Sequence, residues 1–213
     1  QTTFNIFGNR TNYKVISQNG KMNSQFTFRY DKENYLIQKN RLDPHGNLNA
    51  KTIFKYEENG NKIVEKRFKT DNTLDSQTFF KYDNKGNKIA QSSYYSNGEI
   101  ISKFTYSYNE KRNQTEYKRY NHDNKLDIKG TLKYNLKGDI TESYEYNNKD
   151  QIVSKALYYY DKKGNLIEEK KYNSKGEIKL QTTFKHEFDI KCNFIKAIAY
   201  KNKIPISMIK REI

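Results

Sequence analysis

Cysteine, proline, tryptophan and long apolar runs are scarce or missing in this chain. It has one cysteine, two prolines and no tryptophan among 213 residues. A single cysteine, Cys192, excludes an intramolecular disulfide and a cysteine-based metal cluster. No apolar run approaches the roughly 20 residues that a membrane-spanning helix needs. The chain is therefore not expected to span a membrane.

Apolar and acidic residues are also under-represented. Hydrophobic residues make up 34% of the chain, and the mean hydropathy is −1.13, which by itself is typical of disorder. The chain has 40 Lys and Arg but only 25 Asp and Glu, so its net charge is +15. Such a charge attracts acidic partners, but it also keeps water-facing strands soluble and discourages edge pairing. We favour the second interpretation. The alternative is that the electrostatic field of these charges selects an acidic partner.

Against this polar background, one aromatic ring recurs every 26 residues, and we call its place position 0. Positions 12, 18 and 24 of each copy also carry aromatic or aliphatic residues, and a final copy begins at Phe188 after a two-residue insertion. Disorder would not keep this spacing, so the sequence predicts an array of stacked units. We expect a single repeat domain over residues 4–213, made of eight copies, with an N-terminal tail over 1–3. The rings at position 0 are Phe4, Tyr30, Tyr56, Tyr82, Tyr108, Tyr134 and Tyr160.

Each copy contains two turn signals and two strand signals. In the copy that begins at Tyr82, the turns are Asp83 to Asn87 and the segment around Asn97-Gly98, and Asn and Gly accept the positive φ of tight hairpins. Residues 100–108 alternate in polarity, which predicts a strand with one buried and one wet face. The fold class is thus all-β: an elongated, twisted or spiralling antiparallel sheet of about 16 strands, two per copy.

The basic residues are spread along all the copies and favour positions 21 and 25 of the repeat. At these positions a strand that faces water on one side needs charge. The residues are Lys51, Lys103, Lys129 and Lys155 at position 21, and Arg29, Lys55, Lys81, Lys133 and Lys185 at position 25.

The first turn of the repeat resembles the Y-D-x-x-G signature of the bacterial RHS/YD-repeat family, as in Tyr82-Asp83-Asn84-Lys85-Gly86. The Tyr-Asn-x-x-Gly half repeats are similar to MORN-like repeats. The resemblance covers essentially the whole chain, although Glu57, Asn109 and Asn135 replace the Asp, and Asn34 and Arg112 replace the Gly. It implies a spiralling β-sheet shell of the kind found in envelope-associated and secreted bacterial proteins.

Candidate catalytic and metal-binding residues are few. His45, His122 and His186 lie at or beside turns of different copies, and no pair has metal-ligand spacing. The sequence has no Gly-rich phosphate loop, nucleophile elbow or Cys–His pair. Cys192 takes position 4, where other copies carry Gly, and we interpret it as a tolerated small residue rather than a reactive thiol. We expect no enzymatic activity, no metal and no cofactor.

Aromatic residues outside the repeating positions are the best binding candidates, because the repeat does not require them. By alternation, Phe79 and Tyr159 should point away from the face of positions 18–24, among lysines. Rings beside cations suit stacking on sugars or bases, or anchoring a protein, whereas cross-strand ring pairs are the structural alternative. The non-repeat rings include Tyr13 and Tyr35, and the candidate binding set is Phe79, Tyr95, Tyr117, Tyr144, Tyr159, Lys81, Lys133 and Lys155.

These patterns favour a non-catalytic scaffold of the bacterial cell envelope that presents its sheet to an envelope protein. One alternative is carbohydrate binding through exposed rings. Another is binding of nucleic acid or anionic lipid through the positive charge, with nucleic acid the less expected partner. The chain begins with Gln1 rather than Met, which is compatible with a cleaved signal peptide. We therefore expect a secreted, periplasmic or cell-surface location.

Overall fold

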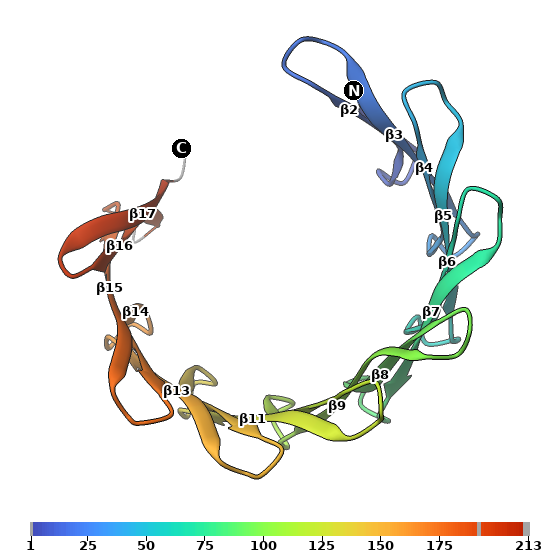
Figure 1. Cartoon of the computed structure of the whole chain (residues 1–213). Coiled ribbons are helices and arrows are strands. Elements are labelled where there is room, and N and C mark those ends of the chain that lie inside the picture. The colour runs from blue at the N-terminus through green and yellow to red at the C-terminus, as the bar shows by residue number, and fades with distance from the viewer. Residues whose placement is uncertain (1, 191–192, 211–213) are drawn as a thin grey trace. The chain divides into compact units, whose positions relative to one another are not determined.

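A computed structural model describes residues 2–190 and 193–210, so Cys192 lies outside the described residues. Every regular element in these ranges is a β-strand (Figure 1), which confirms the all-β fold class. The strands number 17 rather than about 16, and the additional one is β1, which includes Thr2 and Thr3 of the expected tail. The strands are β1 (Thr2–Phe4), β2 (Arg10–Ile16), β3 (Met22–Tyr30), β4 (Leu36–Leu42), β5 (Leu48–Tyr56), β6 (Lys62–Phe68), β7 (Leu74–Tyr82), β8 (Lys88–Tyr95), β9 (Ile100–Tyr108), β10 (Gln114–Tyr120), β11 (Leu126–Tyr134), β12 (Ile140–Asn147), β13 (Ile152–Tyr160), β14 (Leu166–Asn173), β15 (Ile178–Phe188), β16 (Phe194–Lys201) and β17 (Ile204–Lys210).

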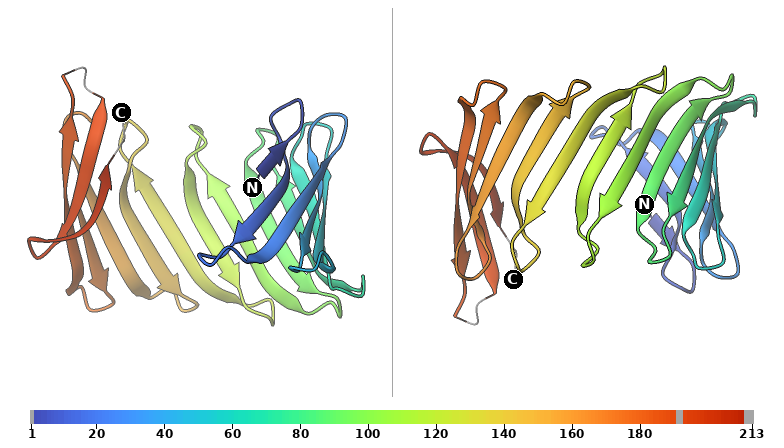
Figure 2. Two further views of the ribbon diagram at one scale, coloured as in Figure 1. Left: turned by 90° about the horizontal axis from the view of Figure 1, so that it is seen from above. Right: turned by 90° about the horizontal axis from the view of Figure 1, so that it is seen from below.

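The chain divides into two compact units. The first comprises residues 1–105 and 120–125, and the second comprises 106–119 and 126–213. In the first unit, each strand from β1 to β9 pairs antiparallel with the next one along the chain. In the second unit, the same holds from β11 to β17. Within each unit, consecutive strands lie side by side and hairpin turns connect them (Figure 2).

Hairpin turns at both ends of the strands share one hydrogen-bond pattern. After Tyr160, the Asp161 N–H donates to the Asn165 carbonyl at 2.9 Å, and the Gly164 N–H donates to the Asp161 carbonyl at 3.0 Å. One carboxylate oxygen of Asp161 also accepts the N–H groups of Lys163 and Asn165, each at 2.9 Å. The hydrogen bonds from Asn165, side chain first, hold the pKa of Asp161 below its usual value. The acidic or amide residue after position 0 is thus a turn acceptor.

The fourth residue of these turns has a left-handed backbone. Gly164 has a φ of +92°, which glycine adopts without steric cost. Asn34 and Arg112 take the same place with φ of +66° and +65°. The two departures from the glycine signature therefore keep the turn geometry.

The tyrosine at position 0 ties neighbouring strands together. The Tyr82 hydroxyl donates to the Lys62 backbone carbonyl, 20 residues earlier, at 2.9 Å. This bond explains why the repeat carries Tyr rather than Phe at this position. The same bond to the residue 20 positions earlier is made by Tyr30, Tyr56, Tyr134 and Tyr160.

Removing this hydroxyl should cost a measurable part of the stability. We expect Tyr82→Phe to lower the free energy of unfolding by about 1 kcal/mol, the net value of a typical hydrogen bond. Tyr94→Phe is the matched control, because the Tyr94 hydroxyl has no hydrogen-bond partner in the described part of the chain and Phe68 occupies the equivalent position 12. Urea denaturation followed by circular dichroism measures both. Equal losses would refute the role of the hydroxyl.

The prediction of one buried and one wet face is wrong. In β9 all but two of the side chains, those of Ile101 and Ser107, are half-buried, whichever face they point to. No described side chain is fully buried, and the buried apolar residues are the small Ala156 and Ala199. Within each unit the sheet is a single layer, so burial comes from lateral neighbours and not from a second layer. The register also shifts before position 0, for example between Lys81 and Tyr82, so simple alternation ends there.

Lysines at position 21 are not merely solvated charges. Lys51 Nζ lies 4.8 Å from the ring centroid of Phe68, and Lys129 Nζ lies 4.7 Å from that of Tyr146. Such cation–π contacts stabilise a ring that has no second layer above it. The same pairing joins Lys103 to Tyr120 and Lys155 to Tyr172. The basic residues of position 25, Arg29, Lys55, Lys81, Lys133 and Lys185, are exposed as expected.

Candidate functional site

Three of the residues proposed from the sequence lie in the first unit. Phe79 is 40% exposed, and its ring meets the Tyr94 ring edge-on at 6.2 Å. Tyr95 is 50% exposed and begins a hairpin turn, where its N–H donates to the Glu99 carbonyl. Lys81 is exposed on β7. These rings leave apolar surface open to solvent, and their role in binding stays a prediction.

Three other candidates come together in the second unit. The ammonium groups of Lys133 and Lys155 lie 5.7 and 5.4 Å from the ring centroid of Tyr144. The Tyr144 hydroxyl donates to Glu142 at 2.6 Å, and Lys133 pairs with the same carboxylate at 3.1 Å. This hydrogen bond, together with burial, raises the pKa of Tyr144 to about 12. Because lysines already contact its ring, Tyr144 is better explained as part of the sheet than as a stacking platform.

Tyr159 and Tyr117 lie elsewhere in the second unit. Tyr159 is 41% exposed, and the Lys170 ammonium lies 5.2 Å from its ring centroid. Tyr117 is half-buried on β10, and its hydroxyl donates to Glu145 at 2.6 Å. Burial and then this hydrogen bond raise the pKa of Tyr117. Its ring lies over Gly130, where a Cβ atom would overlap with the ring atoms.

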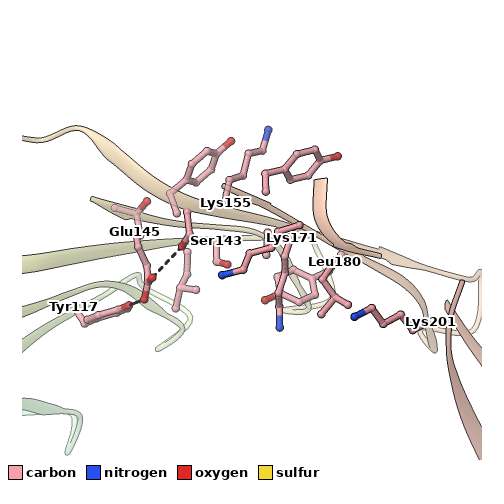
Figure 3. A pocket seen from close by; sticks show the side chains of 15 residues that line it. Tyr117, Ser143, Glu145, Lys155, Lys171, Leu180 and Lys201 are labelled. Carbon is pink, nitrogen blue, oxygen red and sulfur yellow. Dashed lines mark hydrogen bonds between the residues drawn. The ribbon is translucent and has the colours of Figure 1, made fainter. Parts of the chain in front are cut away.

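Tyr117 lines a hollow of about 670 Å³ that belongs entirely to the second unit (Figure 3). We call it the β13 pocket, because β13 supplies the small residues Ser154 and Ala156 at its centre. Tyr117, Glu145, Lys171 and Lys201 line the same hollow, whereas Lys155 projects to the other side of the strands (Figure 3). Neighbouring residues of a strand point to opposite faces, so Lys155 contributes mainly its backbone. The remaining lining residues are Thr131, Leu132, Ser143, Tyr144, Tyr158, Tyr172, Lys179 and Leu180.

Strand register explains why a hollow forms at this place. Ala156 pairs with Ser143 on one side and with Lys171 on the other, and Lys171 pairs with Leu180. Directly opposite residues of antiparallel strands share a face, so the small side chains of Ser143 and Ala156 lie side by side, between Leu132 on one flank and Lys171 on the other. Position 22 is Phe26 in the first copy and Phe104 in the fourth, but Gly130 and Ala156 in two successive copies. The pocket arises where bulky side chains are missing.

Glu145 is the fixed acceptor of the pocket. One of its carboxylate oxygens accepts the Tyr117 hydroxyl at 2.6 Å, and the other accepts the Ser154 hydroxyl at 2.9 Å. Lys171 pairs with Glu169 at 3.1 Å, while Lys201 and Lys179 make no ion pair with any described residue. The pocket therefore combines one oriented carboxylate with an excess of ammonium groups.

Tyr117 could be identified from the sequence as a binding candidate, but its neighbours in the pocket could not. Glu145, Lys171 and Lys201 sit at ordinary polar positions, and nothing in their spacing sets them apart. The signal in the sequence is the small residue at position 22 in two successive copies, Gly130 and Ala156. It indicates a hollow only when the strand register is known.

The histidines remain apart in the described structure. His122 lies 3.4 Å from Asp123, and the His186 ring is 6.4 Å from that of Phe188. Over residues 2–190 and 193–210, no group of three or more His, Cys, Asp or Glu is arranged to hold a metal ion. Over the same ranges, no helix is long and apolar enough to span a membrane.

Comparisons by fold give matches where comparisons by sequence do not. No protein-family model and no curated protein matches the chain. The crystal structure of TcdB2-TccC3 without its hypervariable C-terminal region matches with a TM-score of 0.56 and 13% identity, over 98% of this chain and 11% of that chain. The crystal structure of TcdB2-TccC3-Cdc42 matches with a TM-score of 0.51 and 10% identity, over 92% of this chain and 14% of that chain.

At these identities the likeness concerns the fold alone, and the chain spans only 11% and 14% of the matched chains. It supports an all-β repeat fold like that found in the matched chains. Membership of the YD-repeat or MORN families stays a prediction from the sequence motifs.

Proposed function

We propose that this chain is a non-catalytic binding module that adds an extended segment of a protein partner to strand β17. The observation that supports this proposal is the exposure of the whole strand. All seven residues of β17 are exposed, including Ile204 at 66%, Ile206 at 55%, Met208 at 62% and Ile209 at 66%. Within the second unit, β17 pairs with β16 along one edge and with no other described strand of that unit.

The composition of β17 differs from that of the inner strands. β14 carries four charged residues in eight, whereas β17 carries one, Lys210, in seven. Edge strands of soluble proteins are usually protected by charge, because an open row of N–H and C=O groups invites another strand. β17 has apolar side chains on both faces and only Pro205 as a protecting feature. Strand addition would bury these side chains and satisfy the open backbone groups.

Charge indicates the chemistry of the partner segment. Lys201 and Lys203 precede β17, Lys210 is its last residue, and the whole chain carries a net charge of +15. A segment that alternates apolar and acidic residues would match the apolar side chains and the surrounding lysines together. The proposed setting is the bacterial cell envelope or its exterior, for which the support is the YD-like turn motif.

A synthetic peptide tests this proposal. We expect a fluorescent peptide of alternating valine and glutamate to bind the chain, with affinity measured by anisotropy. Ile206→Glu should weaken binding by about tenfold or more, equivalent to about 1.4 kcal/mol, because it places a carboxylate against the glutamates of the peptide and removes apolar surface that its valines would cover. Ile152→Glu is the matched control, since Ile152 is 43% exposed on β13 of the same unit.

Backbone pairing is checked with the same peptide methylated on alternate amide nitrogens, which cannot complete a strand ladder. Its binding should be lost. Equal binding of the methylated peptide, equal effects of Ile206→Glu and Ile152→Glu, or the absence of binding would each overturn strand addition at β17.

A further inference from the structure

We propose that the β13 pocket binds an acidic saccharide, a sugar that carries a carboxylate group. This inference is distinct from the proposed partner strand, because none of the residues of β17 lines the pocket, and Lys201, which precedes β17, is the pocket residue that the two proposals share. Its volume of about 670 Å³ falls within the range of roughly 300–1,000 Å³ that is typical of small-molecule sites. Three features lie together in the pocket: an oriented carboxylate, ammonium groups without an ion pair and a floor of small residues.

Glu145 is arranged to accept hydroxyl groups. Tyr117 and Ser154 each donate to a different oxygen of its carboxylate, at 2.6 and 2.9 Å. These bonds orient the carboxylate, and each of its oxygens keeps a second lone pair for another donor. A sugar offers several adjacent hydroxyl donors. A polyphosphate offers none and would be repelled by the same carboxylate.

The lysines require a negative charge on the ligand. Lys201 and Lys179 line the pocket without an ion pair in the described chain, and Lys171 is 48% exposed beside Glu169. Lys201 lies on the same face as the pocket floor, since it pairs with Thr182 of β15 and extends into the hollow (Figure 3). Three ammonium groups against the carboxylates of Glu145 and Glu169 leave a net positive site. A neutral sugar would leave these charges without a partner.

The floor of the pocket leaves room for a sugar ring. Ala156 is 6% exposed, and Ser143 and Ser154 add little bulk around it. Leu180 and Tyr158 supply apolar wall, against which the C–H face of a sugar ring packs well. An acidic peptide supplies carboxylates, but its donors are separated backbone N–H groups and not the adjacent hydroxyls that a sugar presents to both oxygens of Glu145. The acidic saccharide is the ligand class that satisfies all three features.

Binding of oligogalacturonate, measured by titration calorimetry, tests the inference. We expect Ala156→Phe to weaken binding by about tenfold or more because the ring fills the hollow. Phenylalanine is compatible with the fold at this position, as Phe26 and Phe104 show. Thr78→Phe, at the same repeat position in the first unit, is the matched control and should leave binding unchanged.

Charge and hydroxyl recognition are tested separately. Lys201→Gln should weaken binding by about fivefold to tenfold, while Arg67→Gln, an equal charge change in the first unit, should not. Lys201 is exposed, so this variant tests the site even if Ala156→Phe does not fold. The methyl-esterified oligosaccharide should bind more weakly than the acid, and so should an oligoglutamate of equal charge.

Several results would overturn the inference. If the methyl ester binds as tightly as the acid, the ligand's charge plays no role. If oligoglutamate binds as tightly as the acidic oligosaccharide, the sugar hydroxyls play no role. Binding that survives both Ala156→Phe and Lys201→Gln would place the saccharide elsewhere, and no binding to the unaltered chain would exclude it.

Discussion

Gly130→Ala is expected to lower the free energy of unfolding by about 1–3 kcal/mol, the usual cost of overpacking. The added Cβ would overlap with Cε1 and Cζ of the Tyr117 ring, which lies directly over this glycine. The ring cannot simply turn away, because its hydroxyl is held by Glu145 at 2.6 Å. Chemical denaturation of the variant and the unaltered chain measures the loss.

Combining Gly130→Ala with a second substitution shows whether the loss comes from this clash or from any alanine at this place in β11. Tyr117→Ser removes the ring, and the next copy already has this combination, with Ser143 opposite Ala156. The double variant should therefore be about as stable as Tyr117→Ser alone, so that Gly130→Ala costs little once the ring is gone. If the alanine costs as much without the ring as with it, the close approach of Tyr117 is not what demands glycine here.

Turns and strands could be predicted from the sequence because their causes are local. Asp83 and Asn87 predict a hairpin turn because the Asp83 carboxylate accepts the backbone N–H of Asn87 at 2.8 Å. The period of 26 residues places such a turn in each copy, and the strands lie between them. The two-residue insertion before Phe188 likewise has a local effect, because it lengthens β15 to 11 residues.

The faces and the pocket could not be predicted, because they depend on pairing between strands. The shift in register before position 0, as between Lys133 and Tyr134, breaks the alternation on which the face assignment was based. The contact of Lys129 with Tyr146 at 4.7 Å requires knowing that these residues lie opposite each other. The same holds for Ala156 and Ser143, whose small size forms the floor of the β13 pocket.

Deletion of one whole repeat of 26 residues should preserve the fold, whereas deletion of only 25 residues should not. Removing residues 53–78 joins Thr52 to Phe79, so a hybrid strand keeps every side chain at its repeat position. Removing residues 53–77 inserts one residue in the middle of that strand. A shift of one residue turns the following side chains to the opposite face, so Phe79 and Tyr82 would lose their partners.

We expect the shorter excision to cost about 3 kcal/mol or more relative to the longer one, as expected when a native contact network is broken. The longer deletion removes more chain and yet should be the more stable. Both lie within the first unit, so they change the same set of strands.

The central claim is that the contacts between copies depend on the period of 26 residues, and urea denaturation of these two deletions tests it most directly. We expect circular dichroism to show one cooperative unfolding transition after removal of residues 53–78 and a much weaker or absent transition after removal of residues 53–77. Equal stability of the two deletion variants would contradict it.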